Sequence, residues 1–300
     1  MITDVNIEPV SIGQLNGWRV TTPYGSALVA QQGGQLLSYT PANGQPLVWL
    51  SEQANLTPGI PVRGGVPICW PWFGVYARNP QVVRDSVAAP SDAASHGWVR
   101  QVPWHLLAQH IEVSAAELEF GFDASPGCAP GWRHDIQLSL RMRFDQAVTL
   151  VLSARNCGQQ ACCTSLALHT YLAVSDSRAI EIHGLEGCEY LDMAHDWRRC
   201  QQSRPITIES ETDRLYPDTQ KPVVVHDPGW KRQVWINSTE SRSTVVWNPW
   251  IDKAKRLADM ADDGWKRMVC VETVRVLDDV LTVLPGETTS ISVSIGLADN

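Results

Sequence analysis

The sequence predicts an all-β protein, a large antiparallel β-sandwich with one or a few short helices. Short apolar runs separated by glycine, proline and other turn residues follow one another along almost the whole chain. Between His134 and Phe144, apolar residues recur at every second position from Ile136 onward, as is typical of an antiparallel strand with one buried face. Two packed sheets with Greek-key-like connections accommodate such strands. We expect one domain over residues 1–300, because sandwiches of about 200–250 residues or more occur as single domains.

The other strands are expected where turn residues bound short apolar runs. Near the N-terminus they cover residues 17–22, 26–30 and 35–40, parted by Pro23, Gly25 and Gly33-Gly34. In the second half they cover residues 148–154, 222–226, 232–236, 244–247 and 290–295.

Two segments depart from this pattern. Residues 75–95 are polar and irregular, which predicts a surface loop. Apolar residues recur at helical spacing after Pro249, which predicts a helix over residues 251–260. On that helix, Lys253, Lys255 and Arg256 are expected to form a solvated face; the alternative is a role near a bound phosphate.

The charge balance limits the class of ligand. The chain has 32 acidic and 24 basic residues, a net charge of −8. Binding to the phosphates of nucleic acid requires a surplus of lysine and arginine, so nucleic acid is not an expected partner. An anionic small molecule would need a local basic cluster. Thirteen tryptophans against four phenylalanines favour aromatic surfaces for a polar ligand, although most of them are expected to fill the core.

Sequence signals for other compartments and cofactors are missing. Residues 1–5 show no signal peptide, and no run approaches about 18 apolar residues, so we expect a cytoplasmic protein without a membrane partner. The eight cysteines have no CxxC or zinc-type spacing and are expected to be reduced thiols. There is no dinucleotide loop, P-loop or nucleophile elbow, and no close grouping of His, Asp and Glu. We therefore expect no cofactor and no metal.

Residues 63–74, with the sequence RGGVPICWPWFG, are the most distinctive segment of the chain. Glycines let the backbone pass close to a ligand, prolines stiffen the segment, and the aromatic rings offer broad apolar surfaces. Such a segment, headed by Arg63, suits a sugar or a sugar phosphate. The alternative is a buried turn between two strands, with Arg63 paired to a carboxylate.

Two side chains have the types that proton transfer requires. In residues 165–172, alternation places His169 and Tyr171 together on one face of a strand, facing a cavity; the alternative is a core histidine bonded to backbone. In residues 267–276, Glu272 shares a face with Met268 and Cys270. Burial raises the pKa of a carboxyl group toward that of a useful base, whereas the alternative for Glu272 is a buried ion pair with an arginine.

The chain resembles the hexose-6-phosphate mutarotases (glucose-6-phosphate 1-epimerases) of the aldose 1-epimerase superfamily. The resemblance lies in residues 63–74 and in His96-Gly97-Trp98-Val99-Arg100, and continues through four later segments in the order of the family. These are Leu168-His169-Thr170, Glu211-Thr212-Asp213-Arg214-Leu215-Tyr216, Val246-Trp247-Asn248-Pro249-Trp250 and Met268-Val269-Cys270-Val271-Glu272. It implies a galactose mutarotase-like β-sandwich and exchange of the α and β anomers of a hexose 6-phosphate, with glucose 6-phosphate as the expected substrate.

The resemblance also implies roles for single residues. His169 matches the family's general acid toward the ring oxygen, and Glu272 matches its general base. His96 and Asp213 match residues that hold the sugar. The family has glutamine before this histidine, whereas this chain has Ser95, whose shorter side chain changes the substrate contact expected there.

Arginines distinguish the phosphohexose branch from other aldose epimerases. Arg63 and Arg100 match arginines of that branch, and Arg78 is a further candidate for phosphate contact. A planar guanidinium binds phosphate through two hydrogen bonds, and two or three such groups would supply the local basic cluster. The alternative is that each arginine forms a salt bridge at the surface.

The sequence is compatible with two other functions. A non-catalytic carbohydrate sensor could use the same sandwich, because function depends on the site and not on the fold. Such a binder has no need of a matched His and Glu. An epimerase for unphosphorylated aldoses is the second. For the enzyme we expect a monomer whose only partner is the small-molecule sugar phosphate.

Overall fold

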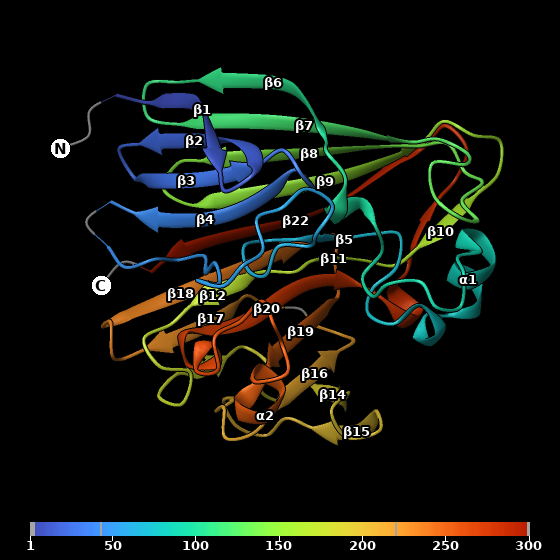
Figure 1. Cartoon of the computed structure of the whole chain (residues 1–300). Helices are drawn as coiled ribbons and strands as arrows, with labels where there is room; N and C mark the ends of the chain where they lie inside the picture. The colour runs from blue at the N-terminus through green and yellow to red at the C-terminus, as the bar shows by residue number, and fades with distance from the viewer. Residues whose placement is uncertain (1–3, 43, 220, 299–300) are drawn as a thin grey trace.

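The computed structural model describes residues 4–42, 44–219 and 221–298, which form antiparallel sheets in two extended layers (Figure 1). Both ends of the expected 1–300 domain, and the first residues considered for a signal peptide, lie outside the described residues. Among those described, no helix is long and apolar enough to cross a membrane.

The first layer is an eight-stranded sheet in the order β13-β17-β18-β22-β9-β8-β7-β6. Its strands are β6 (His105–Ile111), β7 (Ala116–Ala124), β8 (Ile136–Phe144), β9 (Val148–Asn156), β13 (Glu181–His183), β17 (Val223–Asp227), β18 (Arg232–Thr239) and β22 (Thr288–Leu297). The strand expected from alternation over residues 134–144 is β8, in which buried and accessible positions alternate at every residue. The sheet therefore presents one apolar face to the second layer.

The second layer joins two sheets. A four-stranded sheet contains β1 (Asn6–Ile12), β2 (Leu15–Thr22), β3 (Gly25–Ala30) and β4 (Gln35–Pro41) in sequence order. An eight-stranded sheet contains β5 (Ile68–Cys69), β11 (Leu166–Leu168), β12 (Tyr171–Ala173), β14 (Glu189–Asp192), β15 (Arg198–Gln201), β16 (Thr212–Tyr216), β19 (Ser243–Asn248) and β20 (Met268–Arg275). Single-residue bridges such as Leu36 to Val66 and Val48 to Leu172 connect the two.

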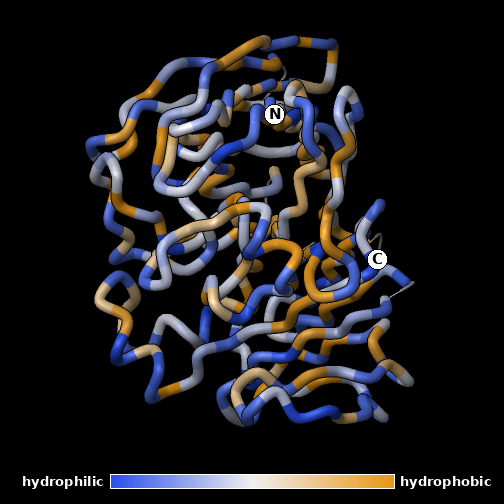
Figure 2. Tube along the Cα trace, turned by 90° about the vertical axis from the view of Figure 1, so that its right-hand side faces the viewer, coloured by the Kyte–Doolittle hydropathy of each residue, from blue (hydrophilic) through white to orange (hydrophobic). Residues whose placement is uncertain are grey.

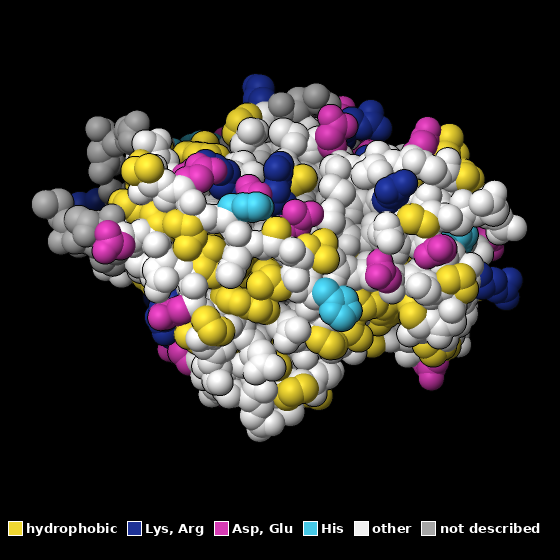
Figure 3. Space-filling view, turned by 90° about the horizontal axis from the view of Figure 1, so that it is seen from above, with side chains coloured by type: hydrophobic (Ala, Val, Ile, Leu, Met, Phe, Trp, Pro, Cys, Tyr) yellow, Lys and Arg dark blue, Asp and Glu magenta, His cyan; other side chains and the backbone are white. Residues whose placement is uncertain are grey.

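The main core lies between the layers. Trp18 of β2 packs edge-on against Phe120 of β7, with ring centroids 5.2 Å apart, and Val271 of β20 belongs to the same buried cluster as Leu140 of β8. Figure 2 shows hydrophobic and hydrophilic segments alternating along the strands. Seen from above, over the edge strand β6, acidic, basic and apolar side chains are interspersed, so the acidic excess forms no single patch on that face (Figure 3).

The remaining elements are short. Strands β10 (Cys162–Thr164) and β21 (Leu281–Val283) pair with each other, and the α-helices are α1 (Gln81–Val87) and α2 (Trp250–Ala254). Single 3-10 turns lie at Tyr76–Arg78, Val99–Gln101, Gly264–Arg267 and Leu277–Asp279.

The secondary structure expected from the sequence was wrong at the following three places. The predicted loop over residues 75–95 contains a 3-10 turn and α1, whose Val83 and Val87 are buried one helical turn apart. The predicted helix over residues 251–260 is α-helical only to Ala254 and continues as tight turns, because Arg256 N–H and Leu257 N–H bond to carbonyls three residues back. The single strand expected through His169 is two strands, β11 and β12, with a break between them.

Candidate active site

A cavity of ≈560 Å³ opens beside β20, within the usual size range of small-molecule sites. The residues to which the sequence analysis assigned catalytic or binding roles all line it: Arg63, Arg78, Ser95, His96, Arg100, His169, Asp213 and Glu272. Folding brings these side chains together from segments that are up to two hundred positions apart.

The break between β11 and β12 places His169. Its backbone N–H donates to the carbonyl of Pro67 at 3.0 Å, and the N–H of Tyr171 donates to the carbonyl of Gly65 at 3.0 Å. The distinctive segment thus fixes the histidine through its backbone. Gly65 lies at φ 72°, and a Cβ there would come within 2.2 Å of the Leu36 carbonyl oxygen, so the segment requires glycine at this point.

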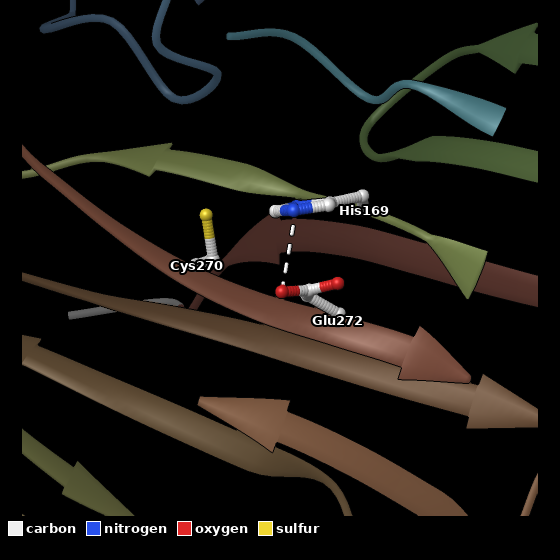
Figure 4. Close-up of side chains that lie close together, drawn as sticks. All are labelled: His169, Cys270 and Glu272. Atoms are coloured by element: carbon white, nitrogen blue, oxygen red, sulfur yellow. Dashed lines mark ion pairs between the residues drawn. The ribbon is translucent and has the colours of Figure 1, made fainter. Parts of the chain in front are cut away.

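Glu272 faces the same break. Strand β20 pairs with β11 through Thr273 and with β12 through Cys270, so Glu272 lies opposite the gap. His169 Nδ1 is 3.4 Å from Glu272 Oε1 (Figure 4), and both residues are buried. Neither His169 Nδ1 nor Glu272 Oε2 has a hydrogen-bond partner among the described residues. Unsatisfied buried polar atoms are uncommon, and here both belong to residues that line the cavity.

Burial favours the neutral forms of both groups. It raises the pKa of Glu272 well above its usual value, with Asp213 adding to the effect, and it lowers the pKa of His169, with His96, Arg100 and Arg63 adding. A carboxyl with an imidazole carries the same net charge as a carboxylate with an imidazolium. Moving one proton from Glu272 to His169 therefore converts the neutral pair into a base and an acid without changing its net charge.

Arg63 contacts His169 indirectly, through the ring of Tyr171. Its Nη1 donates to the Tyr171 hydroxyl at 3.0 Å and its Nε to Asp259 Oδ1 at 3.1 Å. The Tyr171 ring stacks on the His169 ring with centroids 4.8 Å apart and an interplanar angle of 8°. The pairing of Arg63 with a carboxylate, one of the two alternatives for this residue, is thus present together with a place in the cavity wall.

His96 is fixed as a neutral hydrogen-bond donor. The Gly74 N–H donates to His96 Nδ1 at 3.3 Å, which leaves the ring proton on Nε2. Burial, Arg100 and Arg63 lower the pKa of His96 to about 3. The next residue, Gly97, lies at φ 68°, and a Cβ there would come within 1.9 Å of the Trp70 carbonyl oxygen. This tight approach to Trp70 holds His96 at the cavity wall.

The other arginines lie at different depths. Arg100 donates from Nη2 to the Ser95 carbonyl at 2.8 Å, while its buried Nε has no partner among the described residues. The role of Ser95 seen here is therefore through its backbone. Arg78 is exposed, and its guanidinium carbon lies 5.9 Å from the centre of the Trp197 ring.

Asp213 on β16 is paired with a lysine. Lys253 Nζ lies 2.7 Å from Glu211 Oε1 and 3.9 Å from Asp213 Oδ2, and Lys253 lines the cavity. The expectation that Lys253 belongs to a solvated face was wrong, because its ammonium group pairs with Glu211 and lines the cavity. Burial raises the pKa of Asp213 to about 6; Lys253 lowers it, and Glu211 and Asp192 raise it.

Sequence reasoning missed two further contributors. Trp197, in the β14–β15 hairpin, lines the cavity beside Arg78, and no pattern in its neighbourhood indicated that position. Cys270 lies beside His169 and Glu272, and donor atoms of the three residues all lie within 4.8 Å of one another. The sequence suggested no metal-binding group because His169 lies about a hundred positions before Cys270 and Glu272.

Comparison with known proteins identifies the family. The family model for aldose 1-epimerase matches residues 18–296. The chain belongs to the aldose 1-epimerase family. It is accordingly an isomerase that interconverts sugar anomers, and the expected enzyme class is confirmed.

The most similar relatives agree with that assignment. A Salmonella typhimurium protein provisionally named glucose-6-phosphate 1-epimerase is 34% identical over 256 residues, which is 85% of this chain and 81% of the relative. The crystal structure of a provisionally named mutarotase from the same organism superposes with a TM-score of 0.88 at 29% identity, covering 100% of this chain and 96% of the other. A galactose mutarotase-like protein of Clostridium acetobutylicum shares the fold, with a TM-score of 0.78 at 14% identity over 99% of each chain. The predicted β-sandwich of this epimerase family is confirmed.

Proposed function

We propose that this aldose 1-epimerase acts on hexose 6-phosphates, with glucose 6-phosphate as the preferred substrate. The observation that carries the proposal is the set of cationic side chains around the cavity that also holds His169 and Glu272: Arg63, Arg78, Arg100 and Lys253. The acidic chain as a whole would repel an anion, so these cations supply local attraction. The name of the Salmonella relative supports the same substrate.

In the proposed mechanism, Glu272 as carboxylate takes the proton from the anomeric hydroxyl while His169 gives a proton to the ring oxygen. The bond between the anomeric carbon and the ring oxygen breaks, the anomeric carbon becomes an aldehyde, and rotation about the adjacent carbon–carbon bond exposes its other face. Reclosure reverses both proton transfers. In ring opening Glu272 gains one proton and His169 loses one, so the pair as a whole neither gains nor loses a proton.

Binding roles follow from the contacts. The His96 Nε2–H and the Asp213 carboxylate would hold sugar oxygens, because one donates and the other accepts. Arg100 is the best-placed phosphate ligand, because its buried Nε lacks an acceptor. Arg78 at the mouth and the remaining nitrogen of Arg63 would add charge. Ser95 would act through its carbonyl, which orients Arg100.

The proposal includes the location and the oligomeric state of the enzyme. A phosphorylated sugar does not cross a membrane unaided, so we place the enzyme in the cytoplasm, working as a monomer on a small-molecule substrate.

The experiment measures anomer exchange by saturation-transfer NMR on glucose 6-phosphate, glucose and galactose. We expect the phosphorylated sugar to have the highest kcat/KM. The Arg100→Met change should lower kcat/KM for glucose 6-phosphate by about 10- to 150-fold, the equivalent of roughly 1.5–3 kcal/mol for charged hydrogen bonds, and leave glucose little affected. Arg141→Met, at an exposed position of β8, is the matched control. Equal kcat/KM for glucose and glucose 6-phosphate would refute the phosphate assignment and leave an epimerase for free aldoses.

A further inference from the structure

Cys270 gives the acid/base pair a third donor atom. It precedes Glu272 by two residues on β20, so both side chains leave the same face of the strand and point toward His169 (Figure 4). The imidazole nitrogen, the thiol sulfur and a carboxylate oxygen lie within 4.8 Å of one another, and all three residues are buried.

The spacing of these donors suits a small tetrahedral cation. Zinc binds cysteine sulfur at about 2.3 Å and histidine nitrogen or carboxylate oxygen at about 2.0–2.2 Å, which separates neighbouring donors of a tetrahedron by roughly 3.3–3.6 Å. His169 Nδ1 and Glu272 Oε1 are already 3.4 Å apart. The sulfur lies at most 4.8 Å from the other two donors. It therefore has to move by at most roughly 1.2–1.5 Å to complete the set.

Unsatisfied atoms point to the same conclusion. His169 Nδ1, in reach of the metal position, has no hydrogen-bond partner among the described residues, and neither does Glu272 Oε2. No reorganisation of existing side-chain hydrogen bonds at these two atoms is therefore needed before a cation binds.

We propose that His169, Cys270 and Glu272 form an inhibitory site for Zn²⁺ and similar thiophilic divalent cations, which bind there in competition with the sugar. Binding forms bonds from the metal to the imidazole nitrogen, the thiolate and the carboxylate, and the displaced thiol and carboxyl protons leave to solvent. A fourth position remains open toward the cavity, as in zinc sites with three protein ligands. Inhibition rests on the proposed roles of His169 and Glu272, since both lose their proton transfer. Metal binding itself does not rest on them.

The donor set also defines which cations are excluded. Mg²⁺ and Ca²⁺ require six or more oxygen ligands, and the set has a single carboxylate, so they should not bind. Arg63 and Arg100 lie nearby and oppose any cation, but thiolate and carboxylate together neutralise a divalent charge. Thiophilic metals are therefore favoured over hard ones of the same charge.

The direct test is titration of the whole protein with Co²⁺, followed by absorption spectroscopy in thiol-free buffer. Wild type should show a thiolate-to-cobalt charge-transfer band in the near ultraviolet that Zn²⁺ removes and Mg²⁺ does not. Cys270→Ser should abolish the band and weaken Zn²⁺ binding by more than about tenfold, because even an outer partner of a metal ligand contributes 10–100-fold. Cys162→Ser, at another buried cysteine, should keep the band. A wild type without the band, or an undiminished band in Cys270→Ser, would overturn the proposal.

A second arm separates binding from catalysis. Anomer-exchange rates are measured with and without Zn²⁺, each variant being compared with its own metal-free rate. Zn²⁺ should raise the apparent KM of wild type. In Cys270→Ser, the same rise in KM should require at least about tenfold more Zn²⁺. Inhibition equally strong in Cys270→Ser would overturn the assigned ligand set. If the metal-free wild type exchanged no anomers, the proposed function would fail while the cobalt spectrum still decided the metal site.

Discussion

Strands β8 and β20 differ in where they place their polar side chains: β8 keeps them accessible, and β20 buries two of them. In β8 every second position is buried, and each buried residue is apolar, from Ile136 to Phe144. In β20 seven consecutive residues are buried, and Glu272 and Thr273 are among them. Strand β8 thus leaves its polar side chains accessible to water, whereas β20 holds an ionisable group away from water with incomplete hydrogen bonding. We infer that the first sheet contributes stability and that the second sacrifices some of it for chemistry.

The largest stability effect is expected in the first sheet. Leu140→Ala removes a fully buried side chain from the core between the layers and should lower the free energy of unfolding by about 2–5 kcal/mol. Urea unfolding measures this loss, and kcat/KM per folded molecule should be unchanged. If Leu140→Ala changed KM and left the free energy of unfolding unchanged, the first sheet would contribute to the site and not to stability, contrary to this account.

At the active site, the free energy of unfolding is expected to change in the opposite direction. Replacing both unsatisfied partners, in His169→Leu/Glu272→Met, should leave the free energy of unfolding unchanged or raise it by about 1–4 kcal/mol, because a buried ionisable pair is costly to desolvate. The control is Arg141→Leu at an exposed position of β8, for which a change within about 0.5 kcal/mol is expected. A double variant less stable than wild type would show that the pair stabilises the fold.

A smaller effect is expected at the cavity mouth. Trp197→Ala should remove an aromatic surface for the apolar face of the sugar and raise KM by about 2- to 12-fold, from roughly 0.5–1.5 kcal/mol of ring contact, with kcat little changed. Trp235→Ala, on β18 and away from the lining of the cavity, is the control. Equal KM values in the two variants would remove Trp197 from the binding site.

The smallest effect is a shift of the pH profile. The pKa of Asp213 is about 6, so its carboxylate is present above that pH and is protonated below it, and KM should rise as pH falls through 6. Lys253 lowers this pKa and Glu211 raises it. Lys253→Met should therefore move the acid limb of kcat/KM to higher pH, and Glu211→Gln should move it to lower pH. Shifts in the same direction would argue against Asp213 as the titrating group.

The sequence predicted the first sheet better than the second for a physical reason. Alternation records one buried face, so the strand over residues 134–144 could be predicted from its pattern alone. Helix α1 was missed because Val82 and Val83 are poor helix formers, although Val83 and Val87 are spaced by one helical turn.

Alternation indicated the faces of His169 and Glu272, but their place in one site was predicted by residue type and by resemblance to a family. No local signal marks the break at His169–Thr170, because the partners that cause it, Gly65 and Pro67, lie a hundred positions earlier in the chain. The inward turn of Lys253 and the approach of Cys270 to His169 likewise depend on long-range packing.

The most direct measurement of the central claim is anomer exchange on glucose 6-phosphate in His169→Asn, Glu272→Gln and the double variant. If the two groups act as one acid/base couple, each single change should lower kcat by about 10²–10⁴-fold, and the double change should cost little more than the worse single one. A single variant that exchanged anomers at the wild-type rate would contradict the account.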